Sequence, residues 1–271
     1  MLKKVSFMGA GSMAESIIAG ILNKDFLTKE QIFVTNRNNQ ERLDKLQESY
    51  QIQVIKDKQE VITDADIVML SMKPHDMEAA IESIKEHIQP NQLIVSVVAG
   101  VSSDDISNLF GKEVPVIRAM PNTSVAIGAS ATAVSKGKHA TEEHINAVIE
   151  LFNTIGTVTV VNEADMHTVT GISGSGPAYI YYFVEAMEKA AVDAGLDKEV
   201  AKDLITQTVV GAGEMLKHSG QTAGELRENI TSPGGTTQSG LEALAFNDFQ
   251  EAVIECVKSA RERSIELGDK I

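Results

Sequence analysis

The sequence predicts an α/β fold with a mostly parallel sheet, followed by an all-helical domain. Through about residue 160, short continuous apolar segments alternate with segments of helical periodicity, which is typical of parallel strands covered by helices on both faces. After that point the alternation stops, and the chain reads as successive helices. We therefore expect two domains, residues 1–161 and residues 162–271.

The chain begins with a strand, a glycine turn and a helix. A buried strand is expected over residues 3–8, and apolar residues recur at helical spacing over residues 13–22. The segment between them reads Gly9-Ala10-Gly11-Ser12-Met13-Ala14. In this arrangement Gly9 permits a tight turn, Gly11 leaves the backbone open to a pyrophosphate, and Ala14 lets helix and strand pack closely. Because a helix N-terminus also attracts anions, the segment predicts dinucleotide binding in a Rossmann-type domain. A turn of the same shape without a ligand is the alternative.

The remaining elements follow in order. Strands are expected over residues 32–35, 53–55, 67–72, 93–98, 114–118, 129–134 and 157–161. Helices are expected between them over residues 41–50, 77–88 and 142–152. The second domain should contain helices over residues 177–194, 198–218, 223–229 and 249–267, with a further helix after Thr237. The two longest are apolar on more than one side, which indicates that a partner subunit covers part of their surface.

Composition narrows the classes of function. The net charge of −14 argues against non-specific binding of nucleic acid, which needs a basic face. The single cysteine, Cys256, excludes an intrachain disulfide and indicates a reducing compartment. No apolar run is long enough to span a membrane and no secretory pattern is visible, so we expect a cytoplasmic protein. No histidine pair or cysteine cluster indicates a metal site.

The end of the second strand selects the nicotinamide cofactor. NAD sites usually place an acidic residue there, whereas a 2′-phosphate needs a cation. Here Asn36 and Arg37 follow the strand, and the first acidic residue is Glu41. The planar fork of Arg37 suits a phosphate, so we expect NADPH, with NADH also possible. A solvated loop arginine is the alternative.

Other strand ends should also face the cofactor, because ligands of open parallel sheets bind beyond the carboxyl ends of the strands. This rule places a group of small residues and backbone groups beside it: Ser71, Met72, Lys73, Pro74, Ala99 and Gly100. Ordinary turns that begin helices are the alternative.

Two glycine-rich segments in the helical domain indicate close approach of a ligand or of another backbone. Residues 171–179 contain three glycines and lead into a long helix. Residues 231–237 precede another helix, and their two glycines allow backbone N–H groups to gather as a seat for a carboxylate. Thr236 and Thr237 add hydroxyl groups there. The alternatives are a packed helix start and a simple N-cap. Because the histidines are scattered, a reaction without a strong general acid fits this inventory, such as hydride transfer to a protonated imine.

These segments resemble pyrroline-5-carboxylate reductase. The matching segments are Gly9–Ala14, Met72–Pro74, Met120–Thr123, Gly171–Tyr179 and Ser232–Thr237. The resemblance implies reduction of (S)-1-pyrroline-5-carboxylate to L-proline with NADPH or NADH, the last step of proline biosynthesis. It also implies a homodimer whose helical domains interlock around the substrate pocket, and further assembly into a decamer.

The resemblance also implies roles for individual residues. Thr237 would hydrogen-bond the ring nitrogen, and N–H groups around Gly235, Thr236 and Thr237 would hold the carboxylate. Glu163 would lie beside the substrate and Asn229 near the nicotinamide. Asn36 and Arg37 would flank the adenosine ribose. Some relatives have asparagine where Lys58 stands here, a departure whose charge would favour a 2′-phosphate.

Two rival functions share parts of this pattern. A β-hydroxyacid dehydrogenase has the same two-domain plan, but it needs a lysine shortly after a Gly-Ser-Gly turn, and residues 177–182 contain none. A regulatory protein that binds NADP without catalysis is the second rival. The intact residues 234–237 argue against it.

Overall fold

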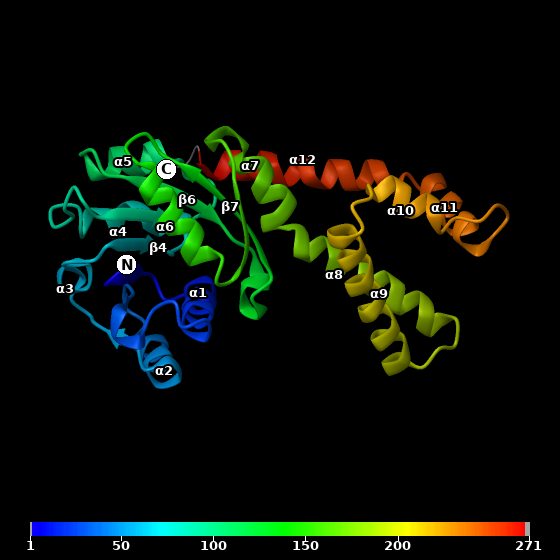
Figure 1. The fold of residues 1–271 in the computed structure, drawn as a ribbon, viewed down its shortest axis with the longest axis horizontal. Coiled ribbons are helices and arrows are strands. Elements are labelled where there is room, and N and C mark those ends of the chain that lie inside the picture. Colours follow the sequence, from blue (N-terminus) through cyan, green and yellow to red (C-terminus); the bar gives the residue numbers. More distant parts are fainter. Residues whose placement is uncertain (1, 269–271) are drawn as a thin grey trace. The chain divides into compact units, whose positions relative to one another are not determined.

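The computed structural model describes residues 2–268 and separates into two compact units. The first comprises the chain up to Ser175 together with the segment from Lys258 onward, and the second comprises Gly176–Val257. Figure 1 shows the fold coloured along the chain. The expected boundary at residues 161 and 162 follows the end of the sheet, whereas the first compact unit continues to Ser175.

The first unit is built on one sheet. Within residues 2–268 its strands are β1 (Val5–Met8), β2 (Ile32–Thr35), β3 (Gln53–Val54), β4 (Ile67–Leu70), β5 (Leu93–Ser96), β6 (Val116–Met120), β7 (Ser130–Lys136) and β8 (Gly156–Val160). The strand order is β3-β2-β1-β4-β5-β6-β7-β8. Neighbouring strands are parallel except for the antiparallel pair β6 and β7. The predicted mostly parallel sheet is confirmed.

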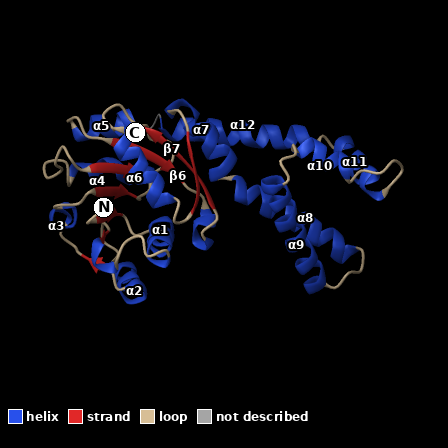
Figure 2. Cartoon of the chain, viewed as in Figure 1, coloured by secondary structure: helices blue, strands red, loops and turns tan. Residues whose placement is uncertain are grey.

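Helices cover both faces of this sheet (Figure 2). They are α1 (Ser12–Asn23), α2 (Gln40–Tyr50), α3 (Lys58–Ile62), α4 (Met77–Glu82), α5 (Ser103–Phe110), α6 (Glu142–Phe152) and α7 (Met166–Val169). One core contains buried side chains of α1, α2 and α6, such as Ile17 and Val148. The other contains side chains of α3, α4 and α5, such as Met77 and Ile106. Because both faces are covered, a central strand such as β4 is apolar at every position.

Short polar signals fix where these helices begin. The Asn39 side chain accepts a hydrogen bond from the Arg42 backbone N–H at the start of α2. Asp57 caps α3 in the same way, and Ser102 forms a reciprocal capping box with Asp105 at the start of α5. Such side chains satisfy N–H groups that the first helical turn leaves unpaired.

Residues 162–175 belong to the first unit because they bond to it. They form the short turns η4 (Glu163–Asp165) and α7 and the π-helical turn η5 (Thr170–Gly174). The Asn122 side-chain amide donates to the Ser173 carbonyl oxygen at 3.0 Å. The end of α12 (Phe249–Gly268) is held similarly, since His167 Nδ1 lies 3.0 Å from the hydroxyl of the buried Ser264.

The second unit is helical. It contains α8 (Gly176–Asp193), α9 (Lys198–His218), α10 (Ala223–Asn229), α11 (Thr236–Phe246) and the start of α12. Helices α8 and α9 pack side by side (Figure 1). Among the described residues 176–257, the buried hydrophobic side chains are Ala201 and Ile205. Large exposed apolar side chains on α8 and α9 include Ile180, Tyr181, Tyr182, Phe183, Leu204, Val210, Met215 and Leu216.

A unit with so small a core buries too little apolar surface to be stable alone, so its helices need a further apolar surface to cover them. No helix within residues 2–268 combines the length and the apolar character required to cross a membrane.

Candidate functional site

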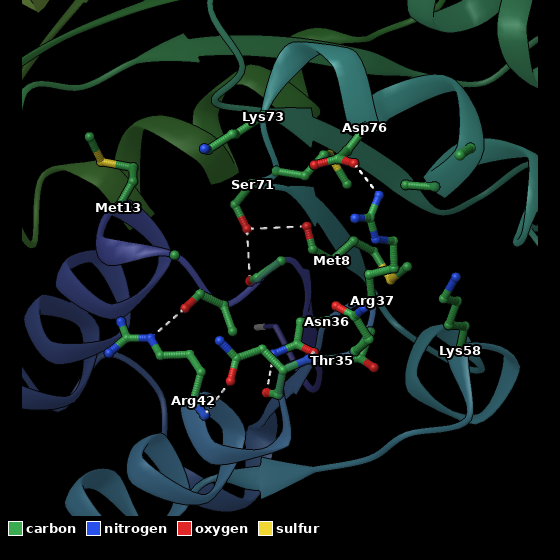
Figure 3. A pocket seen from close by; sticks show the side chains of 18 of the residues that line it. Met8, Met13, Thr35, Asn36, Arg37, Arg42, Lys58, Ser71, Lys73 and Asp76 are labelled. Carbon is green, nitrogen blue, oxygen red and sulfur yellow. Dashed lines mark hydrogen bonds and ion pairs between the residues drawn. The ribbon is translucent and has the colours of Figure 1, made fainter.

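A cavity of about 790 Å³ lies at the carboxyl ends of β1, β2 and β4 (Figure 3). The chain order of the sheet reverses there, because β1 lies between β2 and β4. Its lining includes Met8, Gly9, Ala10, Gly11, Ser12, Met13, Thr35, Asn36, Arg37, Asn38, Asn39, Arg42, Lys58, Ser71, Met72, Lys73, His75, Asp76, Ala79 and Ala80. Open α/β sheets bind their ligands at this reversal point, and the volume is in the range of cofactor sites.

Gly9 joins the three strand ends. Its φ of +118° is a backbone conformation that favours glycine. Its N–H donates to the Thr35 carbonyl oxygen at 2.9 Å, and the Ser71 hydroxyl donates to its carbonyl oxygen at 3.1 Å. A Cβ at this position would lie 2.5 Å from the Ser71 carbonyl oxygen. The turn therefore has room for glycine alone.

The start of α1 opens into the cavity. Gly11 is the N-cap, and it provides no capping side chain. The first intrahelical bond runs from the Glu15 N–H to the Gly11 carbonyl oxygen, so the N–H groups of Ser12 and Met13 face the ligand space without intrahelical partners. Ala14 lies beneath them, fully buried in the core. This combination fits a pyrophosphate.

Arg42 hydrogen-bonds to this turn, a contact that the sequence does not predict. Its Nε donates to the Ala10 carbonyl oxygen at 2.7 Å, and its Nη2 pairs with Glu15 at 2.5 Å. The contact joins α2 to the glycine turn, so it depends on the packing of α1 against α2 and has no local sequence signal.

Two cations line the cavity near the ends of β2 and β3. Arg37 follows β2, and Lys58 begins α3 (Figure 3). The Arg37 side chain is 71% exposed and pairs with Asp76 at 2.6 Å, while Lys58 Nζ donates to the Ser83 hydroxyl at 3.1 Å. Asn36 holds the loop through its amide, which donates to the Asn39 carbonyl oxygen at 2.7 Å. An exposed arginine fork and a lysine suit a phosphate ester.

Other expected cofactor residues divide between the cavity and its surroundings. Ser71, Met72 and Lys73 line the cavity, whereas Pro74, Ala99, Gly100 and Asn229 are not among its lining residues. Gly100 packs against the end of α12, because a Cβ there would lie 3.1 Å from the Ser264 carbonyl oxygen. Asn229 ends α10, and its amide donates to the Gln221 side chain at 3.3 Å. Their roles toward the cofactor remain predictions.

The loop before α11 arranges its N–H groups in a definite way. Gly234 has a φ of +72°, and its N–H donates to the Gln238 side-chain oxygen at 2.7 Å. The Gly235 N–H donates to the carbonyl oxygen three residues earlier at 3.0 Å, and Gly235 is the N-cap of α11. The first intrahelical bond runs from the Ser239 N–H to the Gly235 carbonyl oxygen, so the first-turn N–H groups of Thr236, Thr237 and Gln238 have no intrahelical partner and can hold an anion.

Glu163 is fixed by three donors. Its carboxylate accepts from Arg118 at 2.7 Å, from the Ser135 hydroxyl at 2.6 Å and from the Ser103 N–H at 3.1 Å. The Arg118 side chain is only 3% exposed. Burial by itself raises the pKa of Glu163, but the charge of Arg118 and the hydrogen bonds outweigh burial, so the pKa lies below its ordinary value of 4.5. The carboxylate is ionised at neutral pH.

We expect the Glu163→Gln variant to be less stable by about 2 kcal/mol at neutral pH, because it leaves the buried Arg118 charge without its counter-ion. Since the pKa is lower in the folded state, the stabilisation is complete above the unfolded value of about 4.5 and is lost as the pH falls through the folded value. Urea unfolding from about pH 7 to about pH 3.5 at fixed protein concentration measures this. If the difference in the free energy of unfolding between the variant and the wild type does not become smaller as the pH falls, the account is contradicted.

Comparison with protein families gives two matches. A model described as pyrroline-5-carboxylate reductase dimerisation matches residues 163–267. A model described as NADP oxidoreductase coenzyme F420-dependent matches residues 4–100. The first covers the helical part of the chain, and the second covers all the lining residues of the cavity given above.

Whole-chain relatives agree with these matches. Pyrroline-5-carboxylate reductase 2 of Bacillus subtilis (strain 168) is 48% identical over 269 residues, which cover 99% of this chain and 96% of the relative. A solved pyrroline-5-carboxylate reductase from Coxiella burnetii has a TM-score of 0.90 at 32% identity, covering 98% of this chain and 99% of the other. The Plasmodium falciparum pyrroline carboxylate reductase with NADP bound has a TM-score of 0.89 at 30% identity, covering 99% of this chain and 100% of the other.

Proposed function

The chain belongs to the pyrroline-5-carboxylate reductase family, and from this premise we propose that it reduces (S)-1-pyrroline-5-carboxylate to L-proline. It is an NAD(P)H-dependent oxidoreductase. The observation that carries the proposal is the cavity at the ends of β1, β2 and β4, where a glycine turn, an open helix N-terminus and two cations lie together. This reaction is the last step of proline biosynthesis.

The residues of the cavity divide the work of holding the cofactor. When bound, NADPH supplies the hydride for the reaction. The N–H groups of Ser12 and Met13 would bind the pyrophosphate, and Arg37 with Lys58 would bind the 2′-phosphate. NADH would use the same turn without the phosphate contacts, so both cofactors are accepted and NADPH is preferred.

The loop before α11 is our candidate for the substrate site. The N–H groups of Thr236 and Thr237 would hold the carboxylate, and Gly235 lets the loop turn closely, since a Cβ there would lie 3.1 Å from the Ser232 carbonyl oxygen. The protonated ring nitrogen would donate to the Thr237 hydroxyl oxygen, which orients the imine. Because the imine already carries its proton, no side chain has to transfer one, and orientation supplies most of the rate.

Glu163 is proposed as a neighbour of the substrate on the basis of the resemblance. Its engagement by three donors and its lowered pKa support a fixed negative charge and argue against proton transfer. We also propose, on the resemblance alone, that Asn229 contacts the nicotinamide end of the cofactor.

Replacing Thr237 by alanine should slow turnover by about three- to tenfold, because one neutral hydrogen bond contributes roughly 0.5–1.5 kcal/mol. Steady-state kinetics with saturating NADPH measures the effect. The Thr237→Ser variant keeps the hydroxyl and should stay within about twofold of wild type. Unchanged turnover and unchanged substrate affinity in Thr237→Ala would remove the proposed role.

The exposed apolar side chains of α8 and α9 support assembly through the dimerisation domain. We propose a homodimer and further association into a decamer, which sedimentation velocity would resolve. The single cysteine supports a cytoplasmic location.

The test of the function is oxidation of NADPH and of NADH in parallel with pyrroline-5-carboxylate as substrate, with proline quantified as product. A β-hydroxyacid with NADP⁺ serves as the rival reaction. We expect proline in proportion to NADPH consumed and no oxidation of the hydroxyacid. Oxidation of the hydroxyacid without reduction of the imine would overturn the proposal, and binding without either reaction would favour a regulatory protein.

A further inference from the structure

The ion pair between Arg37 and Asp76 joins two walls of the cofactor cavity. Arg37 follows β2, and Asp76 ends the short turn η2 (Pro74–Asp76) after β4, so the two residues come from strands on opposite sides of β1. Both line the cavity, and the dashed line in Figure 3 marks their contact. A cofactor whose 2′-phosphate seeks Arg37 therefore meets a guanidinium that already has a carboxylate partner.

The two partners differ in freedom. The Arg37 side chain is 71% exposed, whereas that of Asp76 is 28% exposed. The Nε2 atom of His75 also lies 3.5 Å from Asp76. Because exposed ion pairs contribute little, a phosphate dianion can displace the carboxylate. The Asp76 carboxylate nevertheless remains close to the site and repels the bound 2′-phosphate.

We propose that Asp76 is a specificity-determining residue, which competes with the 2′-phosphate of NADPH for the Arg37 guanidinium and so narrows the preference for NADPH over NADH. The proposal rests on the proposed use of NADPH. NADH lacks the 2′-phosphate, so its affinity should depend little on Asp76. The competition therefore lowers the affinity for NADPH alone and brings the two affinities closer together.

The test measures the Kd of each cofactor without substrate. The protein is titrated into NADPH or into NADH, and the fluorescence of the cofactor reports binding. Asp76→Asn should lower the Kd for NADPH by about three- to tenfold and change that for NADH by less than about twofold. In the Arg37→Ala background the same substitution should change NADPH binding by less than about twofold, because the contested guanidinium is gone. Glu82→Gln, which removes a paired carboxylate at the end of α4 (2.7 Å from Lys85), is the control for net charge.

Each other outcome overturns the proposal. Weaker NADPH binding by Asp76→Asn would mean that Asp76 positions Arg37 for the phosphate. If Asp76→Asn raised the affinity for both cofactors equally, or if Glu82→Gln raised the affinity for NADPH as much, the effect would come from the change in net charge. A gain that survives in the Arg37→Ala background would mean repulsion without competition. A wild-type protein that binds neither cofactor would contradict the proposed cofactor itself and is recognised before any variant is compared.

Discussion

Gly9→Ala is expected to lower the free energy of unfolding by about 3 kcal/mol and to weaken NADPH binding by at least about tenfold. Two effects add at this position. The φ of +118° is strained for any residue with a Cβ, and the new Cβ would lie 2.5 Å from the Ser71 carbonyl oxygen. Because that oxygen is backbone at the end of β4, relief requires the glycine turn to move away from its strand.

Gly111→Ala is the matched control. Gly111 also has a positive φ, of +66°, at the C-cap of α5, but a Cβ there would meet nothing within 4 Å. We expect a loss of about 1 kcal/mol and unchanged NADPH binding. Urea unfolding and NADPH fluorescence titration measure the two quantities. If Gly9→Ala proved as mild as Gly111→Ala in both measurements, the close approach of the turn to β4 would not matter.

Arg37→Ala should raise the Kd for NADPH by about 10- to 100-fold and change the Kd for NADH by less than about twofold. A charge-assisted hydrogen bond contributes about 1.5–3 kcal/mol, and NADH has no 2′-phosphate to lose it. Fluorescence titration in low salt gives both dissociation constants. The effect of Arg37→Ala on the Kd for NADPH should become smaller as salt is added, because the Arg37 side chain is exposed.

Arg37→Lys keeps the charge at this position and removes the planar fork. We expect an intermediate affinity for NADPH, since a lysine binds phosphate as a point charge. An Arg37→Ala variant that loses affinity for NADPH and NADH equally would show that Arg37 holds a part common to both cofactors and does not recognise the 2′-phosphate.

The first half of the fold could be predicted because its signals are local. Residue types within six positions predict the glycine turn, and the structure confirms it, with Gly9 at positive φ and Ala14 on the buried face of α1. The expected strand over residues 32–35 and the expected helices over residues 142–152 and 198–218 have the bounds of β2, α6 and α9.

Some local expectations were wrong for identifiable reasons. The helix expected over residues 77–88 ends at Glu82, because the Ser83 hydroxyl donates to the Ala80 carbonyl oxygen and turns follow. Helix α5 was not expected, although Ser102, Asp105 and Gly111 carry the capping signals of its two ends. Its eight residues make too short a periodic pattern to stand out.

The contacts that complete the site could not be predicted, because they join residues distant in the chain. Arg42 meets Ala10 across 32 positions, Arg37 meets Asp76 across 39, and Arg118 meets Glu163 across 45. Periodicity and turn chemistry report on neighbours in sequence. The partners of these side chains follow from strand order instead, which the sequence does not fix residue by residue.

The central claim is that this chain delivers a hydride from the nicotinamide to the imine carbon of pyrroline-5-carboxylate. The most direct test uses NADPH deuterated at both positions of nicotinamide C4 and determines by mass spectrometry where the label goes. The account predicts proline carrying one deuterium, on the ring carbon that was the imine carbon. Unlabelled proline, or consumption of NADPH without proline, would contradict it.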